Sequence, residues 1–113
     1  MPTVLVLLAD DFEEIEAFAP VNLLRRSGVE VTVASLNDNC HATGRSGITA
    51  HADVALTAVA TQIFDLVFLP GGAGVKYLRA DPRLGEIVRQ QHAANRWLAA
   101  IFAAPSVLHD AGI

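Results

Sequence analysis

The sequence predicts an α/β fold: an open, mostly parallel sheet with helices on both faces, in a single domain over residues 1–113. Four short apolar runs without polar–apolar alternation indicate strands that are buried on both faces. A helical pattern or a turn follows each run at its carboxyl end, which is the order that builds a parallel sheet. The four predicted strands are residues 3–9, 29–35, 65–69 and 97–101.

The segment after the first predicted strand changes to the three- and four-residue spacing of a helix. Ile15, Phe18 and Leu23 follow this spacing, with acidic residues before the first turn and arginines in the last. Gly28 is the expected left-handed residue just beyond the helix. Pro20 predicts a kink or a break inside it.

The middle of the chain is less regular. Residues 36–47 are polar and predict a loop or an irregular hairpin, and residues 48–56 predict one short additional strand. Residues 76–95 are predicted to be helical, with Asp81 and Pro82 starting a new helix. The fourth predicted strand turns at once into a short final helix.

Composition excludes several classes of protein. With 52% apolar and 18% charged residues, the chain is neither disordered nor collagen-like. No apolar run approaches the ~18 residues that cross a bilayer, and no signal peptide is expected because the start, Met1-Pro2-Thr3, lacks a positive region. The net charge of −4 and the lack of a basic stripe disfavour nucleic-acid binding. A single cysteine, Cys40, favours a reducing, cytoplasmic location.

Three loops are expected to meet at the carboxyl edge of the sheet, where open α/β sheets bind ligands. They are residues 10–16, 70–74 and 102–106. Four acids of the first loop are expected to be solvated: Asp10, Asp11, Glu13 and Glu14. Glu16 shares a helical face with Phe12 and is expected to point inward, where its carboxyl could donate a hydrogen bond to an anion or a thiolate.

The second loop, residues 70–74 (PGGAG), joins a strand to a helix. Its glycines permit positive φ and allow backbone N–H groups to face a ligand. The loop lacks the spacing of a dinucleotide fingerprint and the lysine and hydroxyl of a phosphate loop. A plain tight turn is the alternative interpretation.

The third loop has the pattern of a nucleophile elbow: a strand ending in small residues, one turn residue, and then a helix. A thiol at such a turn lies near a helix N-terminus, which lowers a thiol pKa. Here the turn residue is Phe102, whose ring offers neither a lone pair nor a proton.

Together these motifs resemble the DJ-1/PfpI superfamily, and more closely its DJ-1-like branch. EEIEA, LPGG and AAI-x-A-x-P occur in that order, and the similarity covers essentially the whole chain. The matching stretches are Val4 to Gly28 (VLVLLADDFEEIEAFAPVNLLRRSG), Val31 to Ser35 (VTVAS), Asp65 to Gly72 (DLVFLPGG) and Leu98 to Pro105 (LAAIFAAP). The resemblance implies a flavodoxin-like three-layer sandwich. It also implies that the chain is the N-terminal part of the family fold, incomplete at the C-terminus.

The resemblance implies roles for individual positions. Glu16 corresponds to the glutamate that hydrogen-bonds the reactive cysteine in the family. Gly71 and Gly72 would line the site with backbone N–H groups, and the N–H of Ala103 would belong to the same pocket. The cysteine itself falls at Phe102. No cofactor and no metal are implied.

Family members are described as glyoxalases, protein deglycases, stress chaperones or, in the protease branch, cysteine peptidases, and they are usually homodimers. The resemblance therefore implies a small reactive carbonyl substrate. Without a thiol at Phe102, this chain is expected to be inactive, with a strained backbone there and a ring that fills the substrate space. The alternatives are a non-catalytic chaperone-like or dimerisation module, a hydrolase or lyase with Glu16 as base, and a flavodoxin-like nucleotide binder.

The remaining reactive side chains carry no predicted site. Cys40 lies in a polar stretch and is expected to be an ordinary loop cysteine. The four histidines are scattered without metal-ligand spacing, so they are expected to be surface or half-buried residues. They are His41, His51, His92 and His109.

Overall fold

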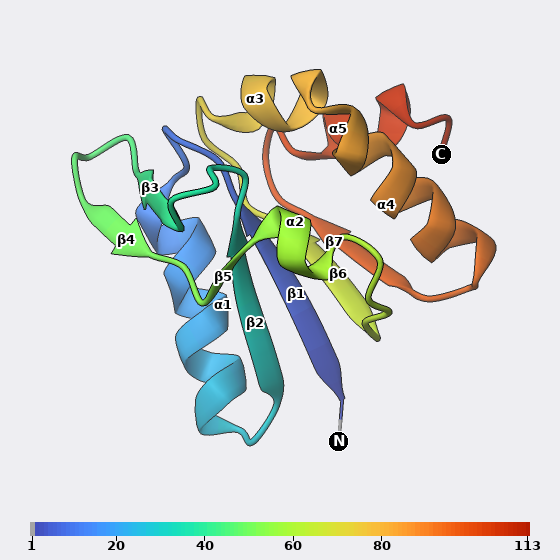
Figure 1. Cartoon of the computed structure of the whole chain (residues 1–113), viewed down its shortest axis with the longest axis horizontal. Coiled ribbons are helices and arrows are strands. Elements are labelled where there is room, and N and C mark those ends of the chain that lie inside the picture. The colour runs from blue at the N-terminus through green and yellow to red at the C-terminus, as the bar shows by residue number, and fades with distance from the viewer. Residues whose placement is uncertain (1) are drawn as a thin grey trace.

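In the computed structural model, which describes residues 2–113, five parallel strands form one sheet in the order β5-β2-β1-β6-β7 (Figure 1). These strands are β1 (Thr3–Leu8), β2 (Glu30–Ser35), β5 (Val54–Ala55), β6 (Leu66–Leu69) and β7 (Trp97–Ala100). The four predicted strands are all parallel members of this sheet, so the predicted flavodoxin-like α/β class is confirmed. The chain builds outward from β1 to β5 and then crosses to β6, which puts the topological switch point between β1 and β6.

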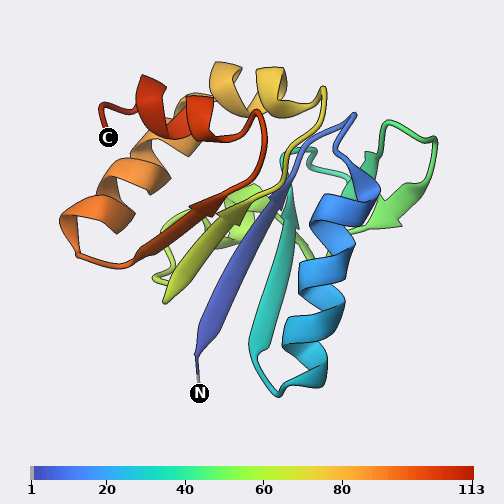
Figure 2. The ribbon, with the colours of Figure 1, turned by 180° about the vertical axis from the view of Figure 1, so that it is seen from behind.

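Helices cover both faces of the sheet (Figures 1 and 2). One face carries α1, and the other carries α2 and α4, with α3 and α5 near the carboxyl ends of the strands. Their bounds are α1 (Glu14–Arg26), α2 (Leu56–Val59), α3 (Val75–Ala80), α4 (Pro82–Ala93) and α5 (Pro105–Asp110). Within residues 2–113, none of these helices has the length and apolar character needed to span a bilayer.

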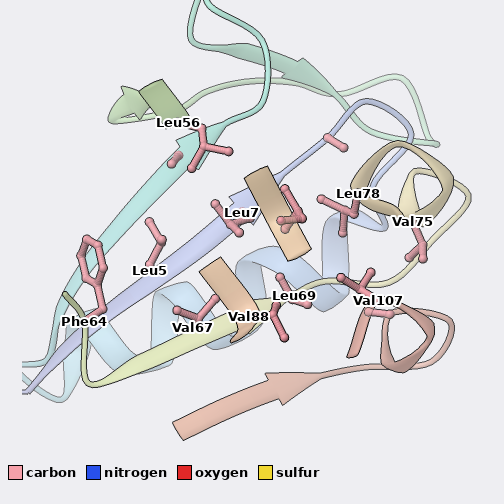
Figure 3. Close-up of a cluster of buried hydrophobic side chains, with 14 of the residues drawn as sticks. Leu5, Leu7, Leu56, Phe64, Val67, Leu69, Val75, Leu78, Val88 and Val107 are labelled. Carbon is pink, nitrogen blue, oxygen red and sulfur yellow. The ribbon is translucent and has the colours of Figure 1, made fainter. Parts of the chain in front are cut away.

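The central position of β1 in the sheet explains why its sequence does not alternate between polar and apolar residues. Leu5 and Leu7 pack in the core beneath α2 and α4 (Figure 3). Val4, Val6 and Leu8 point to the opposite face and pack in the core beneath α1. Both sides of the strand are therefore removed from water, and apolar residues are required at every position.

Helix α1 runs without a break through Pro20, so the predicted break is wrong. Proline has no N–H to donate to the carbonyl of Glu16, four residues earlier, which weakens the helix locally. Ala17 and Val21, on either side of Pro20, are buried against the sheet. This packing holds the helix together where local propensity alone would not. Gly28 follows the helix at φ +85°, as predicted.

An antiparallel hairpin of β3 (His41–Thr43) and β4 (Thr49–His51) lies beside α1. Residues 36–47, predicted as a loop or an irregular hairpin, contain only β3, and its hairpin partner β4 lies in the next segment. Residues 48–56, predicted as one short strand, hold two, because β4 pairs in the hairpin and β5 in the main sheet. Asp53 lies between these two strands, and its carboxylate accepts the N–H of Val33 at 2.8 Å. This contact anchors the chain where it leaves the hairpin for the sheet.

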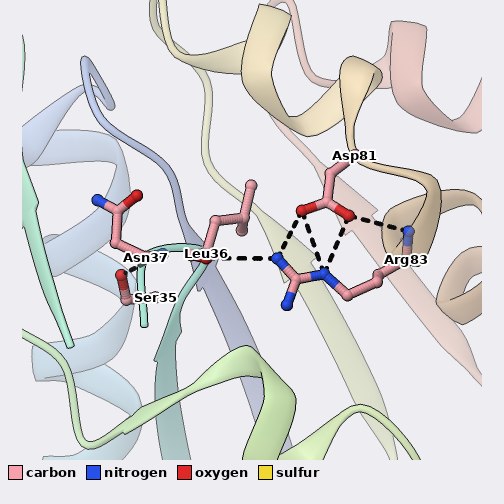
Figure 4. A network of polar contacts seen from close by, with 5 residues as sticks. All are labelled: Ser35, Leu36, Asn37, Asp81 and Arg83. Carbon is pink, nitrogen blue, oxygen red and sulfur yellow. Dashed lines mark hydrogen bonds and ion pairs between the residues drawn. The ribbon is translucent and has the colours of Figure 1, made fainter. Parts of the chain in front are cut away.

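The predicted boundary between α3 and α4 is also confirmed, and a polar network secures it (Figure 4). Asp81 accepts the backbone N–H of Arg83 at 3.0 Å and pairs with its guanidinium at 2.7 Å. The Arg83 hydrogen bond holds the pKa of Asp81 below its ordinary value. The same guanidinium donates to the carbonyl of Leu36 at 3.3 Å, which ties the start of α4 to the end of β2. Beside it, the Ser35 hydroxyl accepts the N–H of Asn37 at 2.9 Å.

Candidate functional site

The three predicted ligand loops meet at the carboxyl edge of the sheet, after β1, β6 and β7. The N–H of Glu13 donates to the carbonyl of Gly71 at 3.0 Å, which joins the first loop to the second. The N–H of Ile101 donates to the carbonyl of Leu69 at 3.3 Å, which holds the third loop beside the second. The convergence follows from three parallel strands ending side by side.

Glu16 and Gly71 form the centre of this site. The Oε1 atom of Glu16 is buried and, among the residues that the structure describes, has no hydrogen-bond partner. A Cβ built on Gly71 would lie 2.5 Å from that oxygen, 2.8 Å from the carbonyl oxygen of Ile101 and 3.3 Å from the Cβ of Phe102. The carboxyl of Glu16 therefore points to the loops of Gly71 and Phe102, as its helical phase predicts. Only a residue without a side chain fits between these groups.

Phe102 occupies the turn of the elbow at φ +53°, in the left-handed region that costs a residue with a Cβ about 1–2 kcal/mol. The predicted strain is thus present. The prediction that its ring fills the substrate space is wrong, because the side chain is 79% exposed. The tight turn directs Phe102 outward, while Ala104, two residues later, takes the buried position in the core.

Gly72 and Ala103 lie on an adjoining groove of about 640 Å³. Gly72 has φ +103°, and a Cβ there would lie 2.6 Å from the backbone nitrogen of Glu13. A glycine is required at this position on both counts. Lys76 of α3 also lines the groove and is exposed. The structure therefore brings Glu16, Gly71 and Phe102 close together. Gly72 and Ala103, the other two predicted site residues, line the adjoining groove.

Glu14 is a buried residue that sequence reasoning assigned to solvent, and that expectation is wrong. Its side chain accepts the backbone N–H groups of Ser46 at 3.0 Å and Ile48 at 3.3 Å, and Glu14 is only 7% exposed. Burial raises the pKa of Glu14, but hydrogen bonds from its own N–H and from Ile48 and Ser46 outweigh this effect and lower it. The carboxyl also occupies the space that a side chain at Gly44 would need.

Glu14 is buried because the β3–β4 hairpin folds over the first turn of α1. No local pattern around Glu14 signals that contact. Of the other acids expected in solvent, Asp10 is exposed, whereas Asp11 and Glu13 are half-buried. All four histidines are exposed and Cys40 is half-buried, in line with the expectation for them. Within residues 2–113, no group of three or more His, Cys, Asp or Glu side chains is arranged to hold a metal ion.

A strand–turn–helix elbow beside a glycine loop, built on a parallel sheet, is the architecture with which many α/β proteins hold a reactive residue. In this chain the turn residue is Phe102. The sequence profile of the DJ-1/PfpI family matches residues 2–113, and the chain belongs to this family.

Individual relatives agree with this assignment. The chain is 38% identical to protein dj-1beta of Drosophila melanogaster over 110 residues, which cover 96% of this chain and 59% of the relative. It is 34% identical to a deglycase of Pyrococcus abyssi, over 97% of this chain and 66% of that protein. The crystal structure of the Drosophila protein matches with a TM-score of 0.95 at 36% identity, covering 99% of this chain and 61% of that one. The chain thus spans about three fifths to two thirds of the length of these relatives.

Proposed function

We propose that this chain carries the reactive-carbonyl site of the DJ-1/PfpI family in a form that performs no thiol chemistry. The observation that carries this proposal is Phe102 at the left-handed turn of the elbow. A cysteine thiolate at this turn would add to an aldehyde carbon, and the carbonyl oxygen would take up a proton to give a hemithioacetal. A phenyl ring has no lone pair with which to form that bond.

The residues around Phe102 support this interpretation. The unpartnered Oε1 of Glu16 is suited to hydrogen-bond a group held at the elbow. Gly71, Gly72 and Ala103 are then the residues that border the bound carbonyl compound. A lone carboxyl can transfer a proton, but Glu16 Oε1 forms no hydrogen bond with an acid or a base among the described residues, which disfavours a hydrolase or lyase without a thiol. On the grounds of its single cysteine, we place the protein in the cytoplasm.

A non-catalytic binding or chaperone-like module that acts as a homodimer is the second candidate, and one surface favours it. Ile15 and Leu23 project from the outer face of α1 and are 76% and 62% exposed. Together with Phe18 they line an apolar groove of about 560 Å³. Contiguous exposed apolar side chains of this kind mark association surfaces, so we assign the groove to contact with a second copy of the chain.

The proposal is tested by methylglyoxal consumption. We expect no consumption by the natural chain. Phe102→Cys in a Cys40→Ser background should gain a thiol that iodoacetamide alkylates faster at neutral pH than it alkylates Cys40 in the natural chain. Phe102→Ala is the matched control, because it removes the same ring without supplying a thiol. Measurable consumption by the natural chain, equal to that by Phe102→Cys, would show that the chemistry does not need this position.

A further inference from the structure

Two histidines from separate strands stack on the β3–β4 hairpin. The ring centroids of His41 and His51 are 4.8 Å apart, and the ring planes differ by 17°. In the antiparallel register, each residue of β3 (His-Ala-Thr) pairs with a residue of the same type in β4 (Thr-Ala-His). The pairs are His41 with His51, Ala42 with Ala50, and Thr43 with Thr49. Histidines that are scattered in the sequence are thus neighbours in the fold.

The hairpin presents this pair to solvent. Ala42 and Ala50 turn inward and pack in the core beneath α1. His41 and His51 are exposed, so both rings are accessible from solvent. The core beneath α1 is therefore completed by the two alanines and does not depend on the histidine rings.

Asn39 sets the tautomer of His41. The His41 Nδ1 lies 2.8 Å from the backbone oxygen of Asn39, and a carbonyl oxygen only accepts hydrogen bonds. The proton therefore sits on Nδ1, and Nε2 keeps its lone pair. The Asn39 side chain also accepts the backbone N–H of His41 at 3.0 Å, which holds this turn in place. Metal-binding histidines are commonly oriented by such a second hydrogen bond.

We propose that His41 and His51 form a two-histidine site for a divalent late transition-metal ion, such as Ni²⁺ or Zn²⁺. Imidazole nitrogens suit these ions, whereas Mg²⁺ and Ca²⁺ take oxygen ligands. The hydrogen bond to Asn39 holds the His41 ring, and a rotation of the His51 ring would bring one of its nitrogens beside Nε2 of His41. No third His, Cys, Asp or Glu joins the pair within residues 2–113, so water completes the coordination. The site lies on the hairpin and does not depend on the chemistry of the elbow.

Calorimetric titration of the full chain with Ni²⁺ at about pH 7.5 tests the proposal, because the imidazoles must be neutral to bind. We expect one ion per chain. His41→Ala and His51→Ala should each weaken Ni²⁺ binding by roughly tenfold or more. Only one imidazole would then hold the ion, and two linked ligands bind an ion more tightly than one. His92→Ala and Cys40→Ser are matched controls and should bind as the natural chain does. Unchanged affinity in His51→Ala, or lost binding in Cys40→Ser, would overturn the assignment.

Proton NMR provides a second measurement that does not rely on substitution. Paramagnetic Ni²⁺ should broaden the ring signals of His41 and His51 at concentrations that leave His92 and His109 sharp. Mg²⁺ at the same concentrations should change none of them. Broadening that is equal at all four histidines would mean that no specific site exists and that the stack serves only to pair the two strands.

Discussion

The buried Oε1 of Glu16 lies so close to Gly71 that a Cβ on the glycine would be 2.5 Å from it. Glu16 belongs to the first turn of α1, whereas Gly71 follows β6. The glycine thus allows a helix and a strand end to approach closely enough to bury one carboxyl oxygen at the elbow. Site geometry and local stability depend on the same contact.

Gly71→Ala should lower the free energy of unfolding by about 1–3 kcal/mol, because the added methyl group overpacks this contact. The carbonyl of Ile101, 2.8 Å from the new Cβ, is backbone and cannot move aside alone. Urea unfolding followed by circular dichroism measures the effect. Gly85→Ala is the control: its Cβ meets only the flexible guanidinium of Arg89, at 3.2 Å, and alanine favours the helix by about 0.5–1 kcal/mol. Equal stability of Gly71→Ala and the natural chain would contradict the close approach.

Phe102→Gly should raise the free energy of unfolding by about 1 kcal/mol, because glycine adopts the left-handed region without the steric cost of a Cβ. The exposed ring contributes little burial that could be lost. Phe102→Ala, which removes the ring but keeps the Cβ, should remain close to the natural chain in the same urea experiment. A large loss of stability in Phe102→Ala would show instead that the ring is packed.

Glu14→Gln should speed amide hydrogen exchange at Ser46 and Ile48, because the carboxylate that accepts both N–H groups is lost. The pKa of Glu14 is lowered in the folded protein, so its stabilising contribution is fully present above the ordinary glutamate value of about 4.3. That contribution is lost as the pH falls through the lower folded value.

The measurement is exchange at these two amides, followed by NMR from neutral to acidic pH. Protection in the natural chain should decline at acidic pH, whereas in Glu14→Gln it should be low throughout. The exposed Glu86 provides the control, since Glu86→Gln should leave the hairpin amides unchanged. Identical pH profiles for the natural chain and Glu14→Gln would rule out this role.

Ile15→Glu and Leu23→Glu should each convert a dimer of this chain to monomer, because a charge is placed within the apolar groove of α1. Sedimentation velocity at several concentrations measures the change. Ile63→Glu is the control, since Ile63 is also highly exposed but does not line this groove. A natural chain that remains monomeric at all concentrations would remove the homodimer from the proposed function.

Local patterns in the sequence determine much of this protein. The apolar run at Thr3–Leu8 requires burial on both faces, and three similar runs follow it, so the parallel sheet could be predicted. The elbow at Phe102 could also be predicted, because a strand that meets a helix in one turn forces a left-handed residue there. The inward direction of Glu16 follows from its position on α1. Each of these features depends on residues close together in the chain.

Contacts between distant segments were decided only by the tertiary structure. Glu14 is buried because the hairpin folds over α1, and His41 meets His51 because the two strands pair in one particular register. The same holds for Phe102, whose ring points outward because Ala104 fills the core position beneath the elbow. Periodicity shows which face of an element is apolar. It does not show which distant segment will cover that face, because that choice depends on packing and backbone hydrogen bonds across the whole domain.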